Sequence, residues 1–98
     1  GSVTRDFTHV RDVVRANILA MTGEKVGKGE VINIGAGENH SVQEVAEMIG
    51  GQISYLEPRV EPHDTLADNT LAKELLGWVP QVNFKDGIEE LKKMRNIL

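Results

Sequence analysis

Apolar residues recur at the spacing of one helix face in several stretches of the chain. The clearest stretch begins at Ser41, which forms a capping box with Glu44: the hydroxyl accepts a backbone N–H of the first turn, and the carboxylate reaches back to the cap. Its apolar positions follow at i, i+3, i+4 and i+7, and they are Val42, Val45, Ala46 and Ile49. Because two glycines follow at positions 50 and 51, we expect a helix that ends there.

Three further helices are predicted, each with an expected cap. Asp12 is expected to cap the first, Asp68 a short one that Gly77 ends, and Asn83 the terminal one. The apolar positions behind these predictions are, in chain order, Val13, Val14, Ile18 and Met21, then Leu71, Leu75 and Leu76, then Phe84, Ile88, Leu91 and Met94.

Two short strands are predicted between these helices. Residues 30–34 are too few and too rich in β-branched side chains for a helix, and a Gly-Ala-Gly turn at 35–37 ends them. Residues 52–56 alternate like a half-buried strand, while Pro58 and Pro62 exclude regular structure directly after them. The predicted order is helix, strand, helix, strand, helix, helix. The expected fold class is therefore mixed α/β.

Composition limits the classes of protein that this chain fits. Its 98 residues allow a single domain, 1–98, with a thin core. A net charge of −4 predicts no binding to nucleic acid or to an anionic membrane surface, and no apolar run approaches the ~20 residues of a membrane span. The absence of cysteine excludes a disulfide, a thiolate nucleophile and a cysteine zinc site, and it fits a cytoplasmic location.

Arg5 and Arg59 are the candidate ligand-binding residues. A guanidinium presents a planar fork of donors that suits phosphate oxygens, and both arginines lie outside the predicted helices. Two such groups on one diphosphate would act as a clamp. The alternative is that each forms a surface ion pair, Arg5 with Asp6 or Asp12, and Arg59 with Glu57 or Glu61.

The histidines and the tryptophan are expected to have structural roles. No pair among His9, His40 and His63 has the i, i+4 helical spacing of a metal site. His9 is expected to pack in the structure, and the other two to face solvent. Trp78 could stack on a base, but it follows a helix-stopping glycine and is expected to cover the small core.

Three segments of the chain carry a resemblance to a known family. They are residues 4–14, which include Arg5-Asp6-Phe7, residues 58–68, and the run Leu-Leu-Gly-Trp-Val-Pro at 75–80. In this order and spacing they resemble the carboxy-terminal part of an NAD-dependent nucleotide-sugar epimerase or dehydratase of the extended short-chain dehydrogenase type, similar to UDP-glucose 4-epimerase. The resemblance implies a small substrate-binding segment of that fold, without its amino-terminal Rossmann half.

The resemblance also implies the residues of a substrate site. Arg5 and Arg59 match the arginines that approach the diphosphate of the nucleotide sugar, and Phe7 matches an aromatic residue near the nucleotide pocket. An acidic residue after the second arginine contacts the nucleoside in several members, and here it corresponds to Glu61 or Asp64. The sequence departs from the family pattern around 60–63, where Val-Glu-Pro-His replaces the usual residues.

The catalytic residues of the family have no match in this chain. Family members use a Tyr-x-x-x-Lys pair and an amino-terminal Gly-x-x-Gly-x-x-Gly turn for NAD, whereas Tyr55 is followed four residues later by Arg59. The turn at 35–37 lacks the third glycine of a dinucleotide fingerprint and is expected to be a tight strand-to-helix turn. We therefore expect this chain to bind no cofactor, with NAD held elsewhere in a parent enzyme.

The resulting hypothesis is a nucleotide-sugar-binding portion of an NAD-dependent UDP-hexose 4-epimerase, inactive alone. The parent could instead be a nucleotide-sugar 4,6-dehydratase, or the chain could be a stand-alone binding or interaction module without catalysis. The expected partners are a nucleotide-diphosphate sugar and the missing amino-terminal Rossmann domain. A homodimer or a swapped oligomer is expected for the chain by itself, because deletion of that domain would leave apolar surface uncovered.

Overall fold

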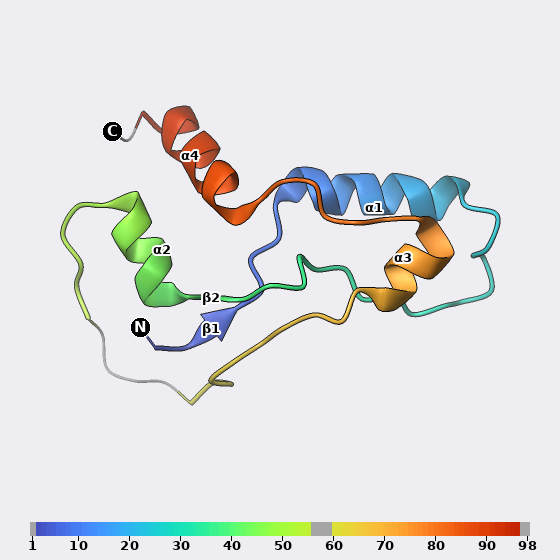
Figure 1. Ribbon diagram of the computed structural model, residues 1–98, viewed down its shortest axis with the longest axis horizontal. Helices are drawn as coiled ribbons and strands as arrows, with labels where there is room; N and C mark the ends of the chain where they lie inside the picture. Colours follow the sequence, from blue (N-terminus) through green and yellow to red (C-terminus); the bar gives the residue numbers. More distant parts are fainter. Residues whose placement is uncertain (1, 56–59, 97–98) are drawn as a thin grey trace.

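A computed structural model describes residues 2–55 and 60–96 of the chain. Within these ranges the elements follow in the order β1 (Thr4–Arg5), α1 (Val10–Thr22), β2 (His40–Ser41), α2 (Val42–Ile49), α3 (Thr70–Leu76) and α4 (Phe84–Met94). They form a flat, elongated body with extents of 48 × 33 × 16 Å (Figure 1). The mixed α/β class is confirmed, but the strands lie at other positions than the sequence predicts.

Strand β1 lies between two other segments. It pairs antiparallel with β2, so that Thr4 is opposite Ser41 and Arg5 is opposite His40. On its other side Thr4 forms a parallel bridge to Asp64. The Thr4 N–H donates to the His63 carbonyl at 2.8 Å, and the Thr65 N–H donates to the Thr4 carbonyl at 3.1 Å. The start of the chain is thereby tied to residues 40–41 and to residues 63–65.

Both predicted strands are wrong. Residues 30–34 and 52–55 form no strand, and Leu56, the last residue of the second prediction, lies outside the described residues. A strand needs a neighbour that takes up its N–H and C=O groups, and the described part of this chain pairs neither segment. Ile32 and Ile34 instead place their side chains against the core, which accounts for the apolar pattern of the first segment.

Three local predictions around the helices are confirmed. Ser41 caps α2 and accepts the Glu44 N–H, and Asn83 caps α4 and accepts the Asp86 N–H at 2.8 Å. Gly77 ends α3 in the left-handed region with φ 65°, which glycine adopts at little cost.

Two predicted caps are corrected. Helix α1 begins at Val10, and its cap is His9, whose Nδ1 accepts the Arg11 N–H. Asp12 lies inside the first turn because its carboxylate bonds to a distant segment. Helix α3 is capped by Asn69, without a side-chain hydrogen bond, although Asp68 accepts the Thr70 N–H just before it.

The helices pack as two pairs, α1 with α3 and α2 with α4 (Figure 1). The core lies at the first pair, where Ala16, Ala72 and Trp78 are the buried apolar residues of the described ranges. Trp78 covers this core, as the sequence predicts, and its indole N–H donates to the Asp12 carbonyl at 2.9 Å. The second pair is tied by a hydrogen bond from Lys92 Nζ to the Met48 carbonyl.

The buried Asp12 carboxylate connects α1 to the segment between α3 and α4. It is 2% exposed and accepts the backbone N–H groups of Gln81 and Val82, each at 3.1 Å. Arg15 pairs with the same carboxylate at 3.3 Å and lies over the Trp78 ring. These donors satisfy the hydrogen-bonding capacity of the buried carboxylate. Asp12 thereby links α1 to the segment between α3 and α4.

Candidate functional site

Arg5 extends from β1 towards the segment that follows the undescribed residues 56–59. Its guanidinium forms an ion pair with Glu61 at 3.2 Å, and it donates to the carbonyls of Thr4 at 2.7 Å and His63 at 3.4 Å. The side chain is about a quarter exposed. Arg5 is therefore held by its neighbours and still reachable from solvent.

Asp64 lies on the same side of β1. Its carboxylate accepts the Thr4 hydroxyl at 2.6 Å and pairs with the His63 ring at 2.9 Å. These hydrogen bonds, that of Thr4 first, lower the pKa of Asp64 because they favour the ionised form. His63 is exposed, as predicted.

The structure thus brings together Arg5, Glu61 and Asp64 from two segments far apart in the sequence. Arg59, the other half of the expected clamp, lies outside the described residues. The partner of Arg5 is Glu61, which sequence reasoning assigned to Arg59 as an alternative. The arrangement offers a guanidinium that can contact an anionic group, with carboxylates nearby that can accept hydrogen bonds from neutral groups of the same ligand.

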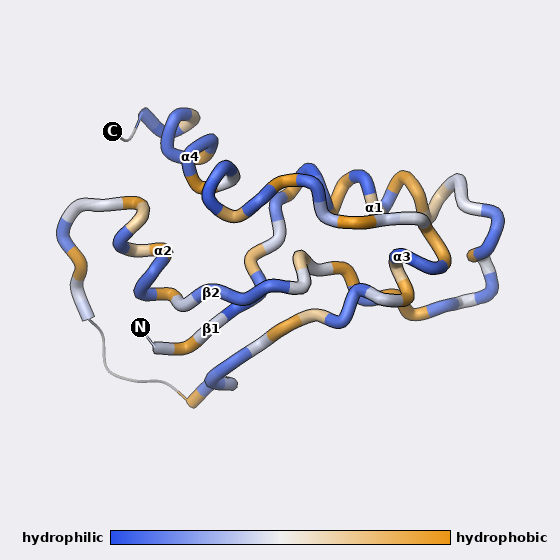
Figure 2. Tube along the Cα trace, viewed as in Figure 1, coloured by the Kyte–Doolittle hydropathy of each residue, from blue (hydrophilic) through white to orange (hydrophobic). Residues whose placement is uncertain are grey.

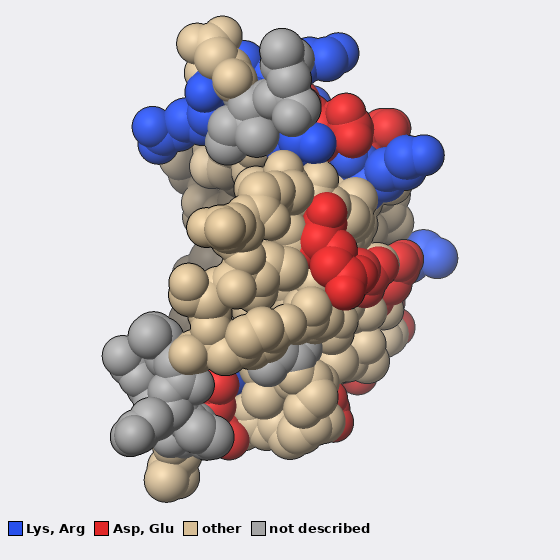
Figure 3. All heavy atoms as spheres, turned by 90° about the vertical axis from the view of Figure 1, so that its left-hand side faces the viewer, with Lys and Arg blue, Asp and Glu red and all other residues tan. Residues whose placement is uncertain are grey.

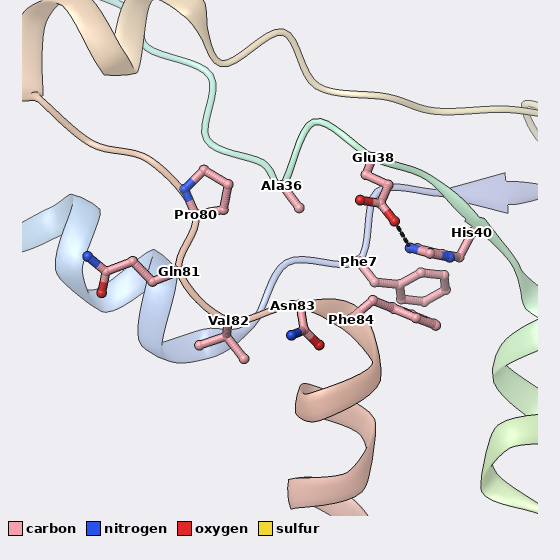
Figure 4. Close-up of a pocket in the computed structure, with 9 residues that line it drawn as sticks. All are labelled: Phe7, Ala36, Glu38, His40, Pro80, Gln81, Val82, Asn83 and Phe84. Atoms are coloured by element: carbon pink, nitrogen blue, oxygen red, sulfur yellow. Dashed lines mark ion pairs between the residues drawn. The ribbon is translucent and has the colours of Figure 1, made fainter.

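Phe7 lies in a separate pocket of about 190 Å³ (Figure 4). The Phe7 ring is tilted against the Phe84 ring, with 5.8 Å between centroids. The His40 ring is stacked flat on the same Phe84 ring, with 3.7 Å between centroids. The pocket is lined by Phe7, Ala36, Glu38, His40, Pro80, Gln81, Val82, Asn83 and Phe84. None of the residues that bond to the Arg5 side chain lines it, although His40, which lies opposite Arg5 on β2, does.

His40 is not exposed as expected, because only 15% of its side chain is accessible. Its Nε2 lies 2.9 Å from a carboxylate oxygen of Glu38 (Figure 4). Its Nδ1 lies 3.1 Å from a carboxylate oxygen of Glu44. Sequence reasoning missed the stack on Phe84 because the two residues are far apart in the chain and local patterns do not reveal such a contact.

His9 packs in the structure, in agreement with the sequence. Its side chain is 7% exposed, and Nε2 lies 3.4 Å from a carboxylate oxygen of Glu90. Because Nδ1 accepts the Arg11 N–H, the neutral ring carries its proton on Nε2. The described ranges contain no group of three or more acidic or histidine residues that could hold a metal ion.

Asp6 is a functional candidate that sequence reasoning missed. Its carboxylate accepts the backbone N–H groups of Ala36 at 2.8 Å, Gly37 at 2.9 Å and Ala67 at 3.1 Å, and the Thr8 hydroxyl at 3.3 Å. It therefore joins the end of β1 to two separate segments. The sequence places Asp6 between Arg5 and Phe7 and contains a glycine-rich turn, and both features could have drawn attention to it. Neither feature predicts which backbone N–H groups its carboxylate accepts.

The turn at 35–37 does not fit a dinucleotide. Its Ala36 and Gly37 N–H groups, which would have to face a pyrophosphate, are already taken by the Asp6 carboxylate. A Cβ on Gly35 would lie 2.3 Å from the Ala67 Cβ, so this glycine permits close packing within the protein. The expectation of a tight structural turn agrees with this geometry.

Charged side chains of both signs lie on the face that Figure 3 shows, with uncharged side chains over much of its middle. Basic side chains gather at the top of this view, and acidic ones lie below them. Lys92 and Lys93 occupy the last turn of α4, and Glu44 lies in the first turn of α2. None of the helices in the described part of the chain has the length and apolarity that crossing a bilayer needs.

Comparison with known proteins connects this geometry to a family. Residues 1–35, which contain β1, Arg5 and α1, match the model of the NAD dependent epimerase/dehydratase family. The UDP-glucose 4-epimerase of Mycolicibacterium smegmatis is 39% identical over 95 residues, which cover 90% of this chain and 30% of that protein. The chain belongs to the NAD-dependent epimerase/dehydratase family.

Other members of the epimerase/dehydratase family carry out different reactions. The UDP-N-acetyl-alpha-D-glucosaminuronate decarboxylase of Bacillus cytotoxicus is 38% identical over 103 residues, which cover 92% of this chain and 32% of that protein. The crystal structure of the UDP-glucuronic acid 4-epimerase of Bacillus cereus, in complex with UDP-glucuronic acid and NAD, has a TM-score of 0.84 at 35% identity. The match covers 100% of this chain and 34% of the epimerase chain. The chain thus spans about a third of the length of the proteins that it matches.

Proposed function

We propose that this chain is the nucleotide-sugar-binding portion of an NAD-dependent UDP-hexose 4-epimerase. The observation that carries the proposal is the position of Arg5, which is presented by β1 at the point where residues 61–65 return to it. A partly exposed guanidinium at a junction of two loops can contact a diphosphate, and Glu61 or Asp64 can contact the nucleoside beside it. Arg59 would complete the clamp.

The surface of the chain supports the need for a further protein segment. The accessible surface is 7434 Å², whereas a compact monomer of 10.8 kDa exposes about 5,500 Å². The radius of gyration is 15.9 Å, against about 13 Å for a compact domain of this length. The extra surface, about 1,900 Å², exceeds the roughly 800 Å² that one partner contributes to a standard interface.

Much of the uncovered apolar surface belongs to α1. Val10, Val14, Ile18 and Met21 recur along one side of this helix, and each is at least half exposed. Apolar positions recur along the whole helix in Figure 2. We propose that an amino-terminal Rossmann domain covers this side in the larger protein, and that the isolated chain forms dimers or swapped oligomers without it.

Chemistry in such an enzyme requires residues that this chain does not supply. NAD accepts the hydride in the reactions of this family, and the turn at 35–37 is not available to hold it. The one tyrosine, Tyr55, is 70% exposed and donates to the Gln43 side chain, away from Arg5. The proposed contribution of this chain is therefore to bind and orient the nucleotide sugar. Its proposed location is the cytoplasm.

Binding of UDP-glucose to the 98-residue chain tests the proposal directly. Chemical-shift titration should show weak, salt-sensitive binding that Arg5→Ala reduces by roughly tenfold or more, because a charge-assisted contact to phosphate is lost. Arg11→Ala is the matched control, since Arg11 pairs with Glu90 on α4, away from Arg5. Equal affinity in the Arg5 and Arg11 variants would overturn the assignment.

The second candidate function is a segment of a nucleotide-sugar dehydratase or decarboxylase, which the similarity to the Bacillus cytotoxicus decarboxylase favours. Both readings share the binding role and differ in the reaction of the larger protein. A third candidate is a stand-alone binding or interaction module. Under all three, the purified chain supplied with NAD and UDP-glucose should give no turnover above a blank, and measurable turnover would contradict the division of roles.

A further inference from the structure

Three segments of the chain meet at the carboxylate of Asp6. The residue continues directly from β1, and its two oxygens accept donors from the turn at 35–37 and from Ala67. The side chain is half-buried, so these bonds are only partly exposed to competition from water. Hydrogen bonds to an ionised acceptor are about twice as strong as neutral ones. The junction is therefore a fixed point of the fold.

This junction lies between the groups of the candidate binding site. Arg5 precedes Asp6 in the chain, and its partners Glu61 and the His63 carbonyl lie on the segment that leads to Ala67. That segment is held beside β1 at two places. One is the bridge at Thr4, and the other is the bond from the Ala67 N–H to Asp6.

The packing around the junction leaves no room for a side chain at Gly35. A Cβ built on Gly35 would lie 2.8 Å from Asp6 Oδ2 and 2.3 Å from the Ala67 Cβ. Both distances are shorter than real Cβ contacts, so the three residues fit together only with glycine at this position. If these segments were loosely packed, a methyl group at position 35 would fit.

We propose that Asp6 is a positioning residue for the diphosphate site, holding residues 61–67 against β1 so that Arg5 presents its guanidinium in one geometry. The inference rests on the proposed function, because it assigns Asp6 a role towards the ligand of Arg5. Asp6 does not touch that ligand itself. Its effect is transmitted through the position of the Arg5 side chain and of the acidic residues beside it.

Asp12 offers a comparison within the same chain. Its carboxylate also accepts two backbone N–H groups from a distant segment, Gln81 and Val82. The segments that it joins carry none of the candidate binding residues. Both aspartates therefore accept backbone N–H groups from distant segments. Only Asp6 holds a segment that carries candidate binding residues.

The test compares Asp6→Asn with Asp12→Asn, using UDP-glucose as the probe and the 98-residue chain under conditions in which each variant is folded by circular dichroism. Asparagine keeps only one acceptor oxygen, and its NH₂ group faces backbone N–H groups that need an acceptor. We expect Asp6→Asn to weaken binding by about tenfold and Asp12→Asn to leave the dissociation constant unchanged, since the charge-assisted bonds lost in the first lie beside Arg5. Equal dissociation constants for the wild type and Asp6→Asn would overturn the proposal.

A double-mutant cycle separates positioning from general stability. In the Arg5→Ala background, Asp6→Asn should have no further effect on affinity, because its effect acts through Arg5. Additive losses would show that Asp6 acts on affinity independently of Arg5 and would overturn the positioning role. If the wild type and Arg5→Ala bind equally, the proposed function itself fails, and this outcome is distinct from the failure of Asp6→Asn alone.

Gly35→Ala provides an independent route to the same junction. It keeps the Asp6 carboxylate and pushes apart the segments that it joins. We expect the same loss of affinity as in Asp6→Asn, together with faster hydrogen exchange at the Ala36, Gly37 and Ala67 amides. Exchange that quickens at these amides without loss of affinity would overturn the positioning role.

Discussion

Arg5 and Glu61 form an ion pair of 3.2 Å although 56 residues separate them in the sequence. The pair is partly exposed, with 26% and 48% of the two side chains accessible, so it contributes no more than about 1 kcal/mol to stability. Its importance lies in the competition between Glu61 and an incoming anion for the same guanidinium. A bound phosphate would have to share Arg5 or displace the carboxylate.

Glu61→Gln should therefore strengthen the binding of inorganic pyrophosphate to the chain. The substitution frees the Arg5 guanidinium and removes a negative charge beside it, while the free energy of unfolding should change by less than about 1 kcal/mol. Isothermal calorimetry measures the affinity. Glu90→Gln is the control because it removes the partner of Arg11 on α4. The same affinity in both variants would show that Glu61 does not compete for Arg5.

Thr4→Val should raise the pKa of Asp64 towards its ordinary value. The Thr4 hydroxyl is the first cause of the lowered pKa of this exposed carboxyl, and valine cannot donate the bond. A depressed folded-state pKa contributes stability above the ordinary pKa of the unfolded chain, and this contribution is lost as the pH falls through the folded value. The Thr4 variant should therefore show a smaller loss of stability on acidification.

Carboxyl ¹³C shifts measure this titration, and the chain contains a matched control. The Thr70 hydroxyl is likewise the first cause of the lowered pKa of Asp68. Thr70→Val should shift the pKa of Asp68 and leave Asp64 alone, with the reverse in Thr4→Val. A Thr4 variant whose Asp64 titrates as in the wild type would contradict the structure around β1.

Asp12→Ala should destabilise the fold by about 2–5 kcal/mol, because the backbone N–H groups of Gln81 and Val82 lose their acceptor. Urea unfolding followed by tryptophan fluorescence reports the loss, since Trp78 donates to the Asp12 carbonyl. Asp68→Ala, at an exposed position before α3, should cost much less stability than Asp12→Ala. Similar losses in the two variants would refute the central role of Asp12.

The isolated chain should associate at tens of micromolar, roughly the range of weak protein association, because one side of α1 is apolar and uncovered. Ile18→Glu should shift the equilibrium to monomer by placing a charge on that side. Val60→Glu adds the same charge at a fully exposed position outside the helix and should have little effect. Sedimentation velocity that shows a monomeric wild type would rule out this interface.

Local sequence signals predicted the helices well. Ser41, Asn83 and Gly77 act on the backbone within a few residues of themselves, and all three have the expected role. These signals fail where a distant group competes. Asp12 resembles a cap in the sequence, but its carboxylate bonds to Gln81 and Val82, and His9 takes the capping position.

The strands and the site were harder to predict for the same reason. The β-branched run at 30–34 has the composition of a strand, yet pairing depends on a neighbour that the described chain does not provide. Strand β1 has no strand signal and forms because His40–Ser41 lies beside it. Motif resemblance singled out Arg5, Glu61 and Asp64 as candidates, and only the folded chain shows their contacts with Thr4 and His63.

The link from Asp12 to Gln81 and Val82 has a consequence for folding on the ribosome. The donors that satisfy the buried carboxylate of α1, and the indole that covers its core, are made nearly seventy residues after that helix, as the separations of 66 to 70 residues show. Contacts of such long sequence separation form slowly, because a large loop must close before they do. Until translation has passed Val82, the Asp12 carboxylate therefore lacks its backbone donors and the core side of α1, at Ala16, lacks its cover. Apolar surface that is exposed for such an interval is prone to aggregation.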